Sequence, residues 1–197
     1  MHTIYNFVSG PLVWVAFILF IGGSLYRLIS LMVLVHRKEK FIYSYMSLKY
    51  SLRSIFRWST PFATENMRRH PVLTIVAFAF HICLILTPIF LLAHVILVEE
   101  AWNLSWWTLP EGMAEIMTLI VIAACVFFLV RRLVQPEVQY VTSASDYILL
   151  AIVAAPFITG LLAYYQWFGY QTLVIMHIVS GEIMLVAIPF TRLSHMM

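Results

Sequence analysis

The chain has 197 residues, of which 62% are hydrophobic and only 11% are charged, and its formal net charge is +3. Soluble domains are usually about 45–50% apolar and about 25% charged, so this composition excludes an ordinary soluble domain and indicates an integral membrane protein. We therefore assign the basic balance to loops at the membrane surface and expect no nucleic-acid partner.

Five apolar runs are each long enough to cross a hydrocarbon core, which takes roughly 20 residues. They predict an all-α protein, a single membrane domain over residues 1–197 that forms a bundle of five transmembrane helices, at about 8–34, 71–98, 113–130, 147–167 and 172–190. The first run has no basic segment before it and is long enough to span, so we expect no cleavable signal peptide. Cys83 and Cys125 lie inside apolar runs and are expected to be small core residues.

Lysine and arginine define the expected topology. They lie in the connections after the first and third runs, at Arg27 near the end of the first run, and at Arg192 after the fifth. Because positive residues are retained in the cytoplasm, we expect the N-terminus outside and the C-terminus in the cytoplasm. The loop over 36–70 is basic and aromatic, and we expect it to lie along the cytoplasmic surface, partly as an amphipathic helix.

Histidines are concentrated on two of the runs. His81 and His94 lie in the second run, and His70 lies at its expected cytoplasmic end. His177 lies in the fifth run, and His195 lies just past the end of that run. A buried ionisable side chain in a membrane is a functional candidate, although one histidine alone more often makes a structural hydrogen bond or serves a proton relay. A haem held between two helices needs an axial imidazole from each, so two such pairs predict two b-type haems.

Spacing suggests how the histidines pair. Eighteen residues separate His177 from His195, which on one continuous helix is about 27 Å and five whole turns, so both would share a face. Thirteen residues separate His81 from His94, about 20 Å, and leave them about 140° apart unless the Thr-Pro pair between them kinks the helix. Because the two helices run antiparallel, we expect His81 to pair with His195 on the inner side and His94 with His177 on the outer side.

Four stretches of the chain resemble one family. They are PFTRLSH near the C-terminus, RRLVQPEVQYVTSASDYILL between the third and fourth runs, FIGGSLYRL in the first run, and EEAW followed by LP in the outer loop. Together they resemble the gamma subunit of respiratory nitrate reductase, a five-span dihaem cytochrome b. The resemblance implies that His195 and His177 are axial ligands, and it implies a location in the cytoplasmic (inner) membrane of a bacterium or archaeon.

The second run departs from that family. FHI supplies His81 and LAH supplies His94, but their spacing is thirteen residues where the family has ten. An alternative register through HICLILTP makes His81 the outer ligand, paired with His177, and His70 the inner ligand, paired with His195. We prefer His81 and His94 and leave His70 open.

Two further departures concern the partner and the substrate. The chain stops soon after His195, and LPEGMAE lacks the lysine that the family carries after Leu-Pro. Both indicate a protein other than nitrate reductase itself. Similar membrane cytochromes occur beside heterodisulfide-reductase-like iron–sulfur subunits in sulfate-respiring bacteria.

These observations predict an electron-transfer subunit of an oxidoreductase complex. It would move electrons between a menaquinone or ubiquinone pool, as exchangeable substrate, and a cytoplasmic iron–sulfur subunit docked at the basic inner face, with further membrane or periplasmic subunits as expected partners. Two alternatives stay open: a quinone-independent electron conduit, and a haem-free membrane anchor or transporter of metal or protons.

The remaining candidates follow from predicted depth. Arg27 could meet a haem propionate or a lipid phosphate, or snorkel to the interface. Glu182 lies deep in the fifth run and could relay protons, pair with a buried base, or hydrogen-bond a neighbouring helix. Small residues that could allow close helix or haem packing are Gly22, Gly23, Gly160 and Gly181. Quinone-site candidates, which could equally be interfacial anchors, are Trp102, Glu111, Glu115, Tyr164, Tyr165 and Gln166.

Overall fold

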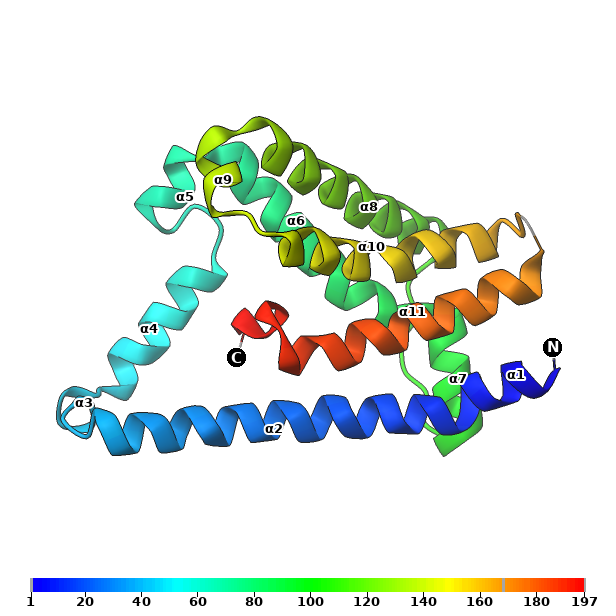
Figure 1. Ribbon diagram of the computed structural model, residues 1–197, viewed down its shortest axis with the longest axis horizontal. Helices are drawn as coiled ribbons and strands as arrows, with labels where there is room; N and C mark the ends of the chain where they lie inside the picture. The colour runs from blue at the N-terminus through cyan, green and yellow to red at the C-terminus, as the bar shows by residue number, and fades with distance from the viewer. Residues whose placement is uncertain (1, 168, 197) are drawn as a thin grey trace. The chain divides into compact units, whose positions relative to one another are not determined.

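The computed structural model describes residues 2–167 and 169–196, apart from the side chains of residues 42 and 196. Within those ranges the chain is α-helical and contains no β-strand (Figure 1). Five helical segments are long and apolar enough to cross a membrane: His2–Lys38, Pro71–Phe90, Glu111–Val134, Ala144–Tyr164 and Tyr170–Phe190. The predicted all-α class with five candidate spans is confirmed. Which terminus lies outside stays a prediction.

Two compact units divide the chain. The first, which we call the terminal unit, comprises Met1–Ser51 and Ser143–Met197, and the second, the central unit, comprises Leu52–Thr142. Each unit therefore contains its own set of candidate spans, and the histidines singled out above are shared between the two.

The terminal unit is built from three long helices. α11 packs against both α10 and α2, antiparallel to α10 and in the same direction as α2 (Figure 1). Its elements are α1 (His2–Phe7), the π-helical turn η1 (Val8–Leu12), α2 (Val13–Lys38), α3 (Ile42–Tyr45), α10 (Ala144–Tyr164), α11 (Tyr170–Phe190) and the 3₁₀ turn η2 (Arg192–Met196).

Glycine sets the closest approach of α2 to α11. A Cβ atom added at Gly23 would lie 2.8 Å from Phe190 Cζ and 2.9 Å from Pro189 Cγ, so only glycine fits without displacing those rings. Neither Gly22 nor Gly181 has a neighbouring atom within 4 Å of such a Cβ. Of these small residues, Gly23 is the one that sets the α2–α11 contact.

The central unit pairs α6 with α8. The rings of Phe80 and Phe128 meet edge to face with centroids 5.4 Å apart, and Val121 is fully buried. Cys83 and Cys125 are buried, as expected for core residues. The elements of this unit are most of α4 (Leu48–Ser59), then α5 (Glu65–Arg69), α6 (Pro71–Phe90), α7 (Leu92–Trp102), α8 (Glu111–Val134) and α9 (Pro136–Val141).

The second predicted run is interrupted. We expected one helix over 71–98, but α6 ends at Phe90 and α7 begins at Leu92, because Leu91 is extended with φ −70° and ψ 128°. Pro88 lies one turn before the break, where its ring crowds the preceding turn and it has no amide hydrogen to donate. The expected kink is therefore a full break in the helix, and His94 belongs to a separate helix from His81.

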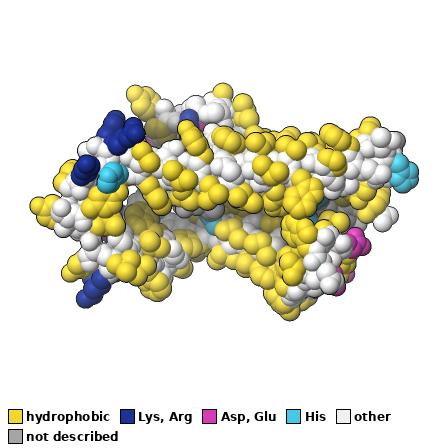
Figure 2. Space-filling view, turned by 90° about the horizontal axis from the view of Figure 1, so that it is seen from below, with side chains coloured by type: hydrophobic (Ala, Val, Ile, Leu, Met, Phe, Trp, Pro, Cys, Tyr) yellow, Lys and Arg dark blue, Asp and Glu magenta, His cyan; other side chains and the backbone are white. Residues whose placement is uncertain are grey.

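The long first helix exposes apolar side chains along its length. Few residues of the candidate span that contains α2 are fully buried, and in Figure 2 hydrophobic side chains line α2 while lysine and arginine gather at its end. Such a surface is compatible with hydrocarbon and not with water, which agrees with a membrane environment.

Candidate functional site

His177 is fixed between α11 and α10. Its ring is half-buried, and Nδ1 lies 2.9 Å from the carbonyl oxygen of Pro156 on α10. Because a carbonyl oxygen can only accept, Nδ1 carries the proton, and the neutral ring has its lone pair on Nε2. The contact joins residues far apart in the chain, so the packing of the two helices sets the orientation of this imidazole.

Gly160 makes room for the His177 ring. A Cβ atom added at Gly160 would lie 3.0 Å from both Cε1 and Nδ1 of His177, tighter than an ordinary van der Waals contact. One turn away, the hydroxyl groups of Thr159 and Ser180 lie 3.2 Å apart and bridge the same two helices, and the Ser180 hydroxyl also donates to the His177 carbonyl oxygen at 2.9 Å. The imidazole therefore sits in a close-packed polar contact that holds one orientation.

His195 lies beyond the end of the helix that carries His177. α11 ends at Phe190, Thr191 is extended, and His195 lies in η2, where Nδ1 is 3.1 Å from the carbonyl oxygen of Arg192. Pro189 precedes this break, as Pro88 precedes the break in the central unit. The five-turn argument for a shared face is therefore wrong, because it assumed one continuous helix from His177 to His195.

The turn that carries His195 is tied to its neighbours by charged side chains. Arg27 Nη1 donates to the carbonyl oxygens of Pro189 at 3.1 Å and Thr191 at 3.5 Å, and so supplies partners to carbonyl groups that a helix end leaves open. Arg192 pairs with Asp146 at 3.0 Å. The backbone of the last turn of α11 and of Thr191 is thus the observed partner of Arg27, while a contact with a haem propionate stays a prediction.

The site predicted from the sequence does not include Asp146. It accepts from the Ser143 amide at 2.8 Å, so the two residues form a capping box at the start of α10, besides the ion pair that Asp146 makes with η2. The Ser-x-x-Asp pattern before an apolar run is the sequence signal that would have found the cap. Its second role, as an anchor for η2, could not be read from local sequence.

His81 lies inside α6 and is anchored to its own helix. Its ring is half-buried, Nδ1 is 2.7 Å from the carbonyl oxygen of Ala77 one turn earlier, and the Phe80 ring lies edge-on to it with centroids 5.2 Å apart. As for His177, the carbonyl partner fixes the proton on Nδ1 and leaves the lone pair on Nε2.

His94 caps the end of α6. Its Nδ1 is 2.8 Å from the carbonyl oxygen of Pro88, and the next two carbonyl groups, of Ile89 and Phe90, accept from the Trp106 indole at 2.9 Å and the Leu109 amide at 2.8 Å. These are among the carbonyl groups that a helix C-terminus leaves without intrahelical partners. The helix break thus both exposes the Pro88 carbonyl and places His94 where it can bind it.

One arrangement recurs at all four preferred histidines. Each places Nδ1 within hydrogen-bond distance of a backbone carbonyl oxygen, and a hydrogen bond of this kind commonly fixes the tautomer and ring orientation of metal-ligating histidines. His70, at the N-cap of α6, is exposed, and the described structure contains no hydrogen bond to its ring. Sequence reasoning found the histidines but not these carbonyl partners, since two of the four lie across a helix break or on another helix.

The histidines are divided between the two units. His81 and His94 belong to the central unit, and His177 and His195 to the terminal unit. In residues 2–167 and 169–196 there is no group of three or more His, Cys, Asp or Glu side chains arranged to hold a metal ion. A haem iron differs from such a site because its porphyrin supplies four nitrogen atoms and the protein needs to add only axial ligands. Pairing of the two histidine sets stays a prediction.

The quinone-site candidates form two groups, one in each unit. Trp102 ends α7, Glu111 begins α8, and Glu115 lies half-buried on the next turn.

In the terminal unit, Tyr164 ends α10 and is followed by Tyr165 and Gln166 in the turn before α11. The rings of Tyr164 and Tyr165 pack at 5.1 Å, Tyr165 stacks with Trp167 at 5.9 Å, and Gln166 adopts a left-handed φ of 56°.

Glu182 is buried within α11. Its side chain is 7% exposed, and neither carboxylate oxygen has a hydrogen-bond partner in the described part of the chain. Burial of an unsatisfied carboxyl group is costly, so this residue is not explained by packing. Of the alternatives given for Glu182, a hydrogen bond to a neighbouring helix is not found among the described residues.

Comparison with known proteins shows that the chain is similar to a bacterial protein over most of its length. No family model matches the chain. The chain is 36% identical over 195 residues to a protein of Nitratidesulfovibrio vulgaris (strain Hildenborough), across 97% of this chain and 86% of that one. The resemblance to nitrate reductase gamma subunits is not tested by this relative and stays a prediction.

Proposed function

The chain belongs to the same family as the Nitratidesulfovibrio vulgaris protein. We propose its function from two features: the five candidate spans, and the four histidines whose rings contact backbone carbonyl oxygens. In this proposal it is the membrane cytochrome b subunit of a respiratory oxidoreductase in the cytoplasmic membrane of a bacterium or archaeon. It binds two b-type haems and moves electrons between a menaquinone or ubiquinone pool and a cytoplasmic iron–sulfur subunit.

The observation that carries the proposal is the common state of four imidazoles. His81, His94, His177 and His195 each have Nδ1 at a backbone carbonyl oxygen, so each presents Nε2 as the basic nitrogen. When neutral, an imidazole with this tautomer is a good axial ligand for haem iron. This donor chemistry supports the proposal of haem b. The preferred pairs are His81 with His195 and His94 with His177.

The contacts that orient the imidazole ring differ from one histidine to the next. Gly160 and Pro156 of α10 hold the ring of His177, the end of α6 holds that of His94, and α6 itself holds that of His81. Arg27 and the Arg192–Asp146 pair fix the turn that carries His195. When bound, the haems supply one-electron transfer; the chain's own part is to orient imidazoles in a medium without water, where competing ligands are excluded.

The proposed orientation of the subunit in the membrane follows from the distribution of charged residues. The connection from α2 to α6 carries six of the twelve basic residues and, in this proposal, lies in the cytoplasm, on the side where the iron–sulfur subunit docks. The opposite ends of the spans carry the aromatic and acidic quinone-site candidates. Quinol oxidation there would release protons outside while electrons leave toward the cytoplasmic partner.

Glu182 is the proposed proton group of the span. A buried carboxylate without a hydrogen-bond partner can accept a proton from a quinol as it is oxidised and then release that proton to water. We expect Glu182→Gln to keep both haems and the wild-type spectrum while slowing haem reduction by a menaquinol analogue. Unchanged reduction kinetics in this variant would remove Glu182 from the proposal without affecting the haem assignment.

The test of the main proposal is a count of haem per chain. Purified wild-type protein should give a reduced-minus-oxidised haem b spectrum with two haems per chain, and alanine at any of the four preferred histidines should remove at least one. His36→Ala is the matched control and should keep both. A wild-type protein without haem b would refute the proposal and favour the haem-free anchor or transporter.

The same count decides the ligand register. If His94→Ala keeps both haems and His70→Ala loses one, then the alternative set with His70 is correct. A chain that binds two haems but is not reduced by menaquinol or ubiquinol analogues would instead be a quinone-independent electron conduit.

A further inference from the structure

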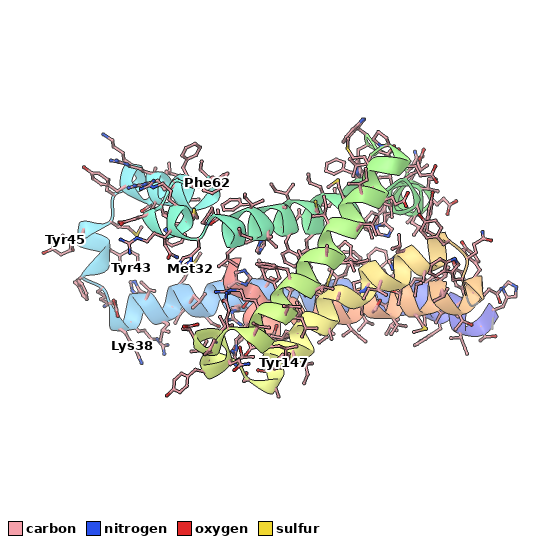
Figure 3. The ribbon with its side chains drawn as sticks, turned by 90° about the horizontal axis from the view of Figure 1, so that it is seen from above. Met32, Lys38, Tyr43, Tyr45, Phe62 and Tyr147 are labelled. Atoms are coloured by element: carbon pink, nitrogen blue, oxygen red, sulfur yellow. The ribbon has the colours of Figure 1, made fainter. Side chains whose placement is uncertain are left out.

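Helix α4 (Leu48–Ser59) has the composition of a helix that lies in a membrane surface. Twelve residues give a length of about 18 Å, which is too short to span a membrane. The helix lies within the connection between the end of α2 and the start of α6. In Figure 3 the chain turns after Lys38 through α3, where Tyr43 and Tyr45 are labelled, and then enters α4. Since α2 and α6 are consecutive spans, α4 is tethered at both ends to the same side of the membrane.

The charged side chains of α4 form one stripe. Lys49, Arg53 and Arg57 are spaced four residues apart, so successive cations are rotated by only about 40° around the helix. All three are exposed, and within the described residues no carboxylate lies close enough to form an ion pair with them. The neighbouring helix α5 differs, because its Arg69 is neutralised by Glu65 at 2.6 Å.

A broad apolar face borders this stripe. Its members share one side of the helix and none is covered by the chain: Leu48, Leu52, Ile55, Phe56 and Trp58 are 75%, 56%, 62%, 71% and 64% exposed. Phe56 adjoins the cationic stripe, at about 20° from Lys49 on an ideal helix. A segment with cations on one flank and large apolar side chains beside them matches the interface between headgroups and acyl chains.

We propose that α4 lies in the membrane interface and binds anionic phospholipid headgroups through Lys49, Arg53 and Arg57, with Leu52 and Phe56 inserted among the acyl chains. This inference stands apart from the haem proposal and holds whichever side of the membrane α4 occupies. Each cation near an anionic surface contributes about a fivefold preference, so three together give roughly a hundredfold preference for an anionic over a neutral surface.

The test uses the full chain in lipid nanodiscs and follows amide hydrogen exchange in residues 50–59. Exchange should be at least tenfold slower in discs that contain phosphatidylglycerol than in discs of phosphatidylcholine alone. The triple variant K49Q/R53Q/R57Q should lose that difference, while R131Q/R132Q, which removes two cations at the end of α8, should keep it.

A second measurement distinguishes loss of lipid binding from unfolding of helix α4. In phosphatidylcholine discs the triple variant should exchange as the wild type does, and 1 M salt should abolish the phosphatidylglycerol effect in the wild type, because the Debye length then falls to about 3 Å. Equal exchange in the two lipids would overturn the proposal. So would protection that appears only in native membranes and not in either disc, which would assign α4 to a protein partner.

Discussion

Replacement of Gly160 by alanine tests whether the contact between α10 and His177 orients the imidazole. The new methyl group would lie 3.0 Å from Cε1 and Nδ1 of His177. Carbon atoms prefer a separation of about 3.5–4.0 Å, so the ring or the helix must move by a few tenths of an ångström. The hydrogen bond from Nδ1 to the Pro156 carbonyl oxygen, now 2.9 Å, would then lengthen to the limit of the normal range or break.

The expected magnitude follows from opposing effects. Alanine gains about 1 kcal/mol over glycine in a helix interior, while overpacking costs about 1–3 kcal/mol and a lost hydrogen bond about 0.5–1.5 kcal/mol. Gly181→Ala is the matched control, because no atom lies within 4 Å of its added methyl group and only the gain applies. The gain is common to both variants, so the free energy of unfolding of Gly160→Ala should fall about 1.5–4.5 kcal/mol below that of Gly181→Ala.

The assay compares the two variants in the same detergent. Thermal unfolding followed by circular dichroism should place Gly160→Ala below Gly181→Ala, and the haem-to-chain ratio of Gly160→Ala alone should fall from two toward one. If both variants unfold at the same temperature and carry the same haem, then Gly160 neither packs against His177 nor orients it, and the reasoning fails.

Three other outcomes follow from the contacts. Gly23→Ala should destabilise the protein by about 1–3 kcal/mol, since the new methyl would lie 2.8 Å from Phe190, while Gly22→Ala should be neutral or stabilising; a thermal melt that ranks them otherwise would contradict the α2–α11 packing. Glu182→Leu should raise the melting temperature, because it removes an unsatisfied buried carboxyl worth about 1–3 kcal/mol, and a lower melting temperature would show that the carboxyl has a partner. Asp146→Ala should cost about 0.5–2 kcal/mol, because it removes the acceptor of the α10 capping box and the partner of Arg192, and it should speed proteolysis at η2; unchanged proteolysis would argue against that anchor.

The sequence alone was sufficient for the membrane spans and for the histidines. Hydropathy over a window of about 20 residues reports a local property, so all five apolar segments could be read without knowledge of packing. The Ser143 to Asp146 cap is local for the same reason, and its pattern is visible in the chain. An ionisable residue inside an apolar run is equally visible, which is why His81, His177 and Glu182 could be singled out.

Tertiary structure decided the surroundings of those residues. The breaks at Leu91 and Thr191 removed the helical phase on which both histidine spacings depended, because each helix ends soon after a proline that the apolar pattern runs straight through. Gly23 and Gly160 mark close approaches and Gly22 and Gly181 do not, although all four are glycines in apolar helices. Which glycine is needed, and which carbonyl oxygen binds His177, depends on the surface that one helix presents to another, and that surface is set by packing between residues far apart in the chain.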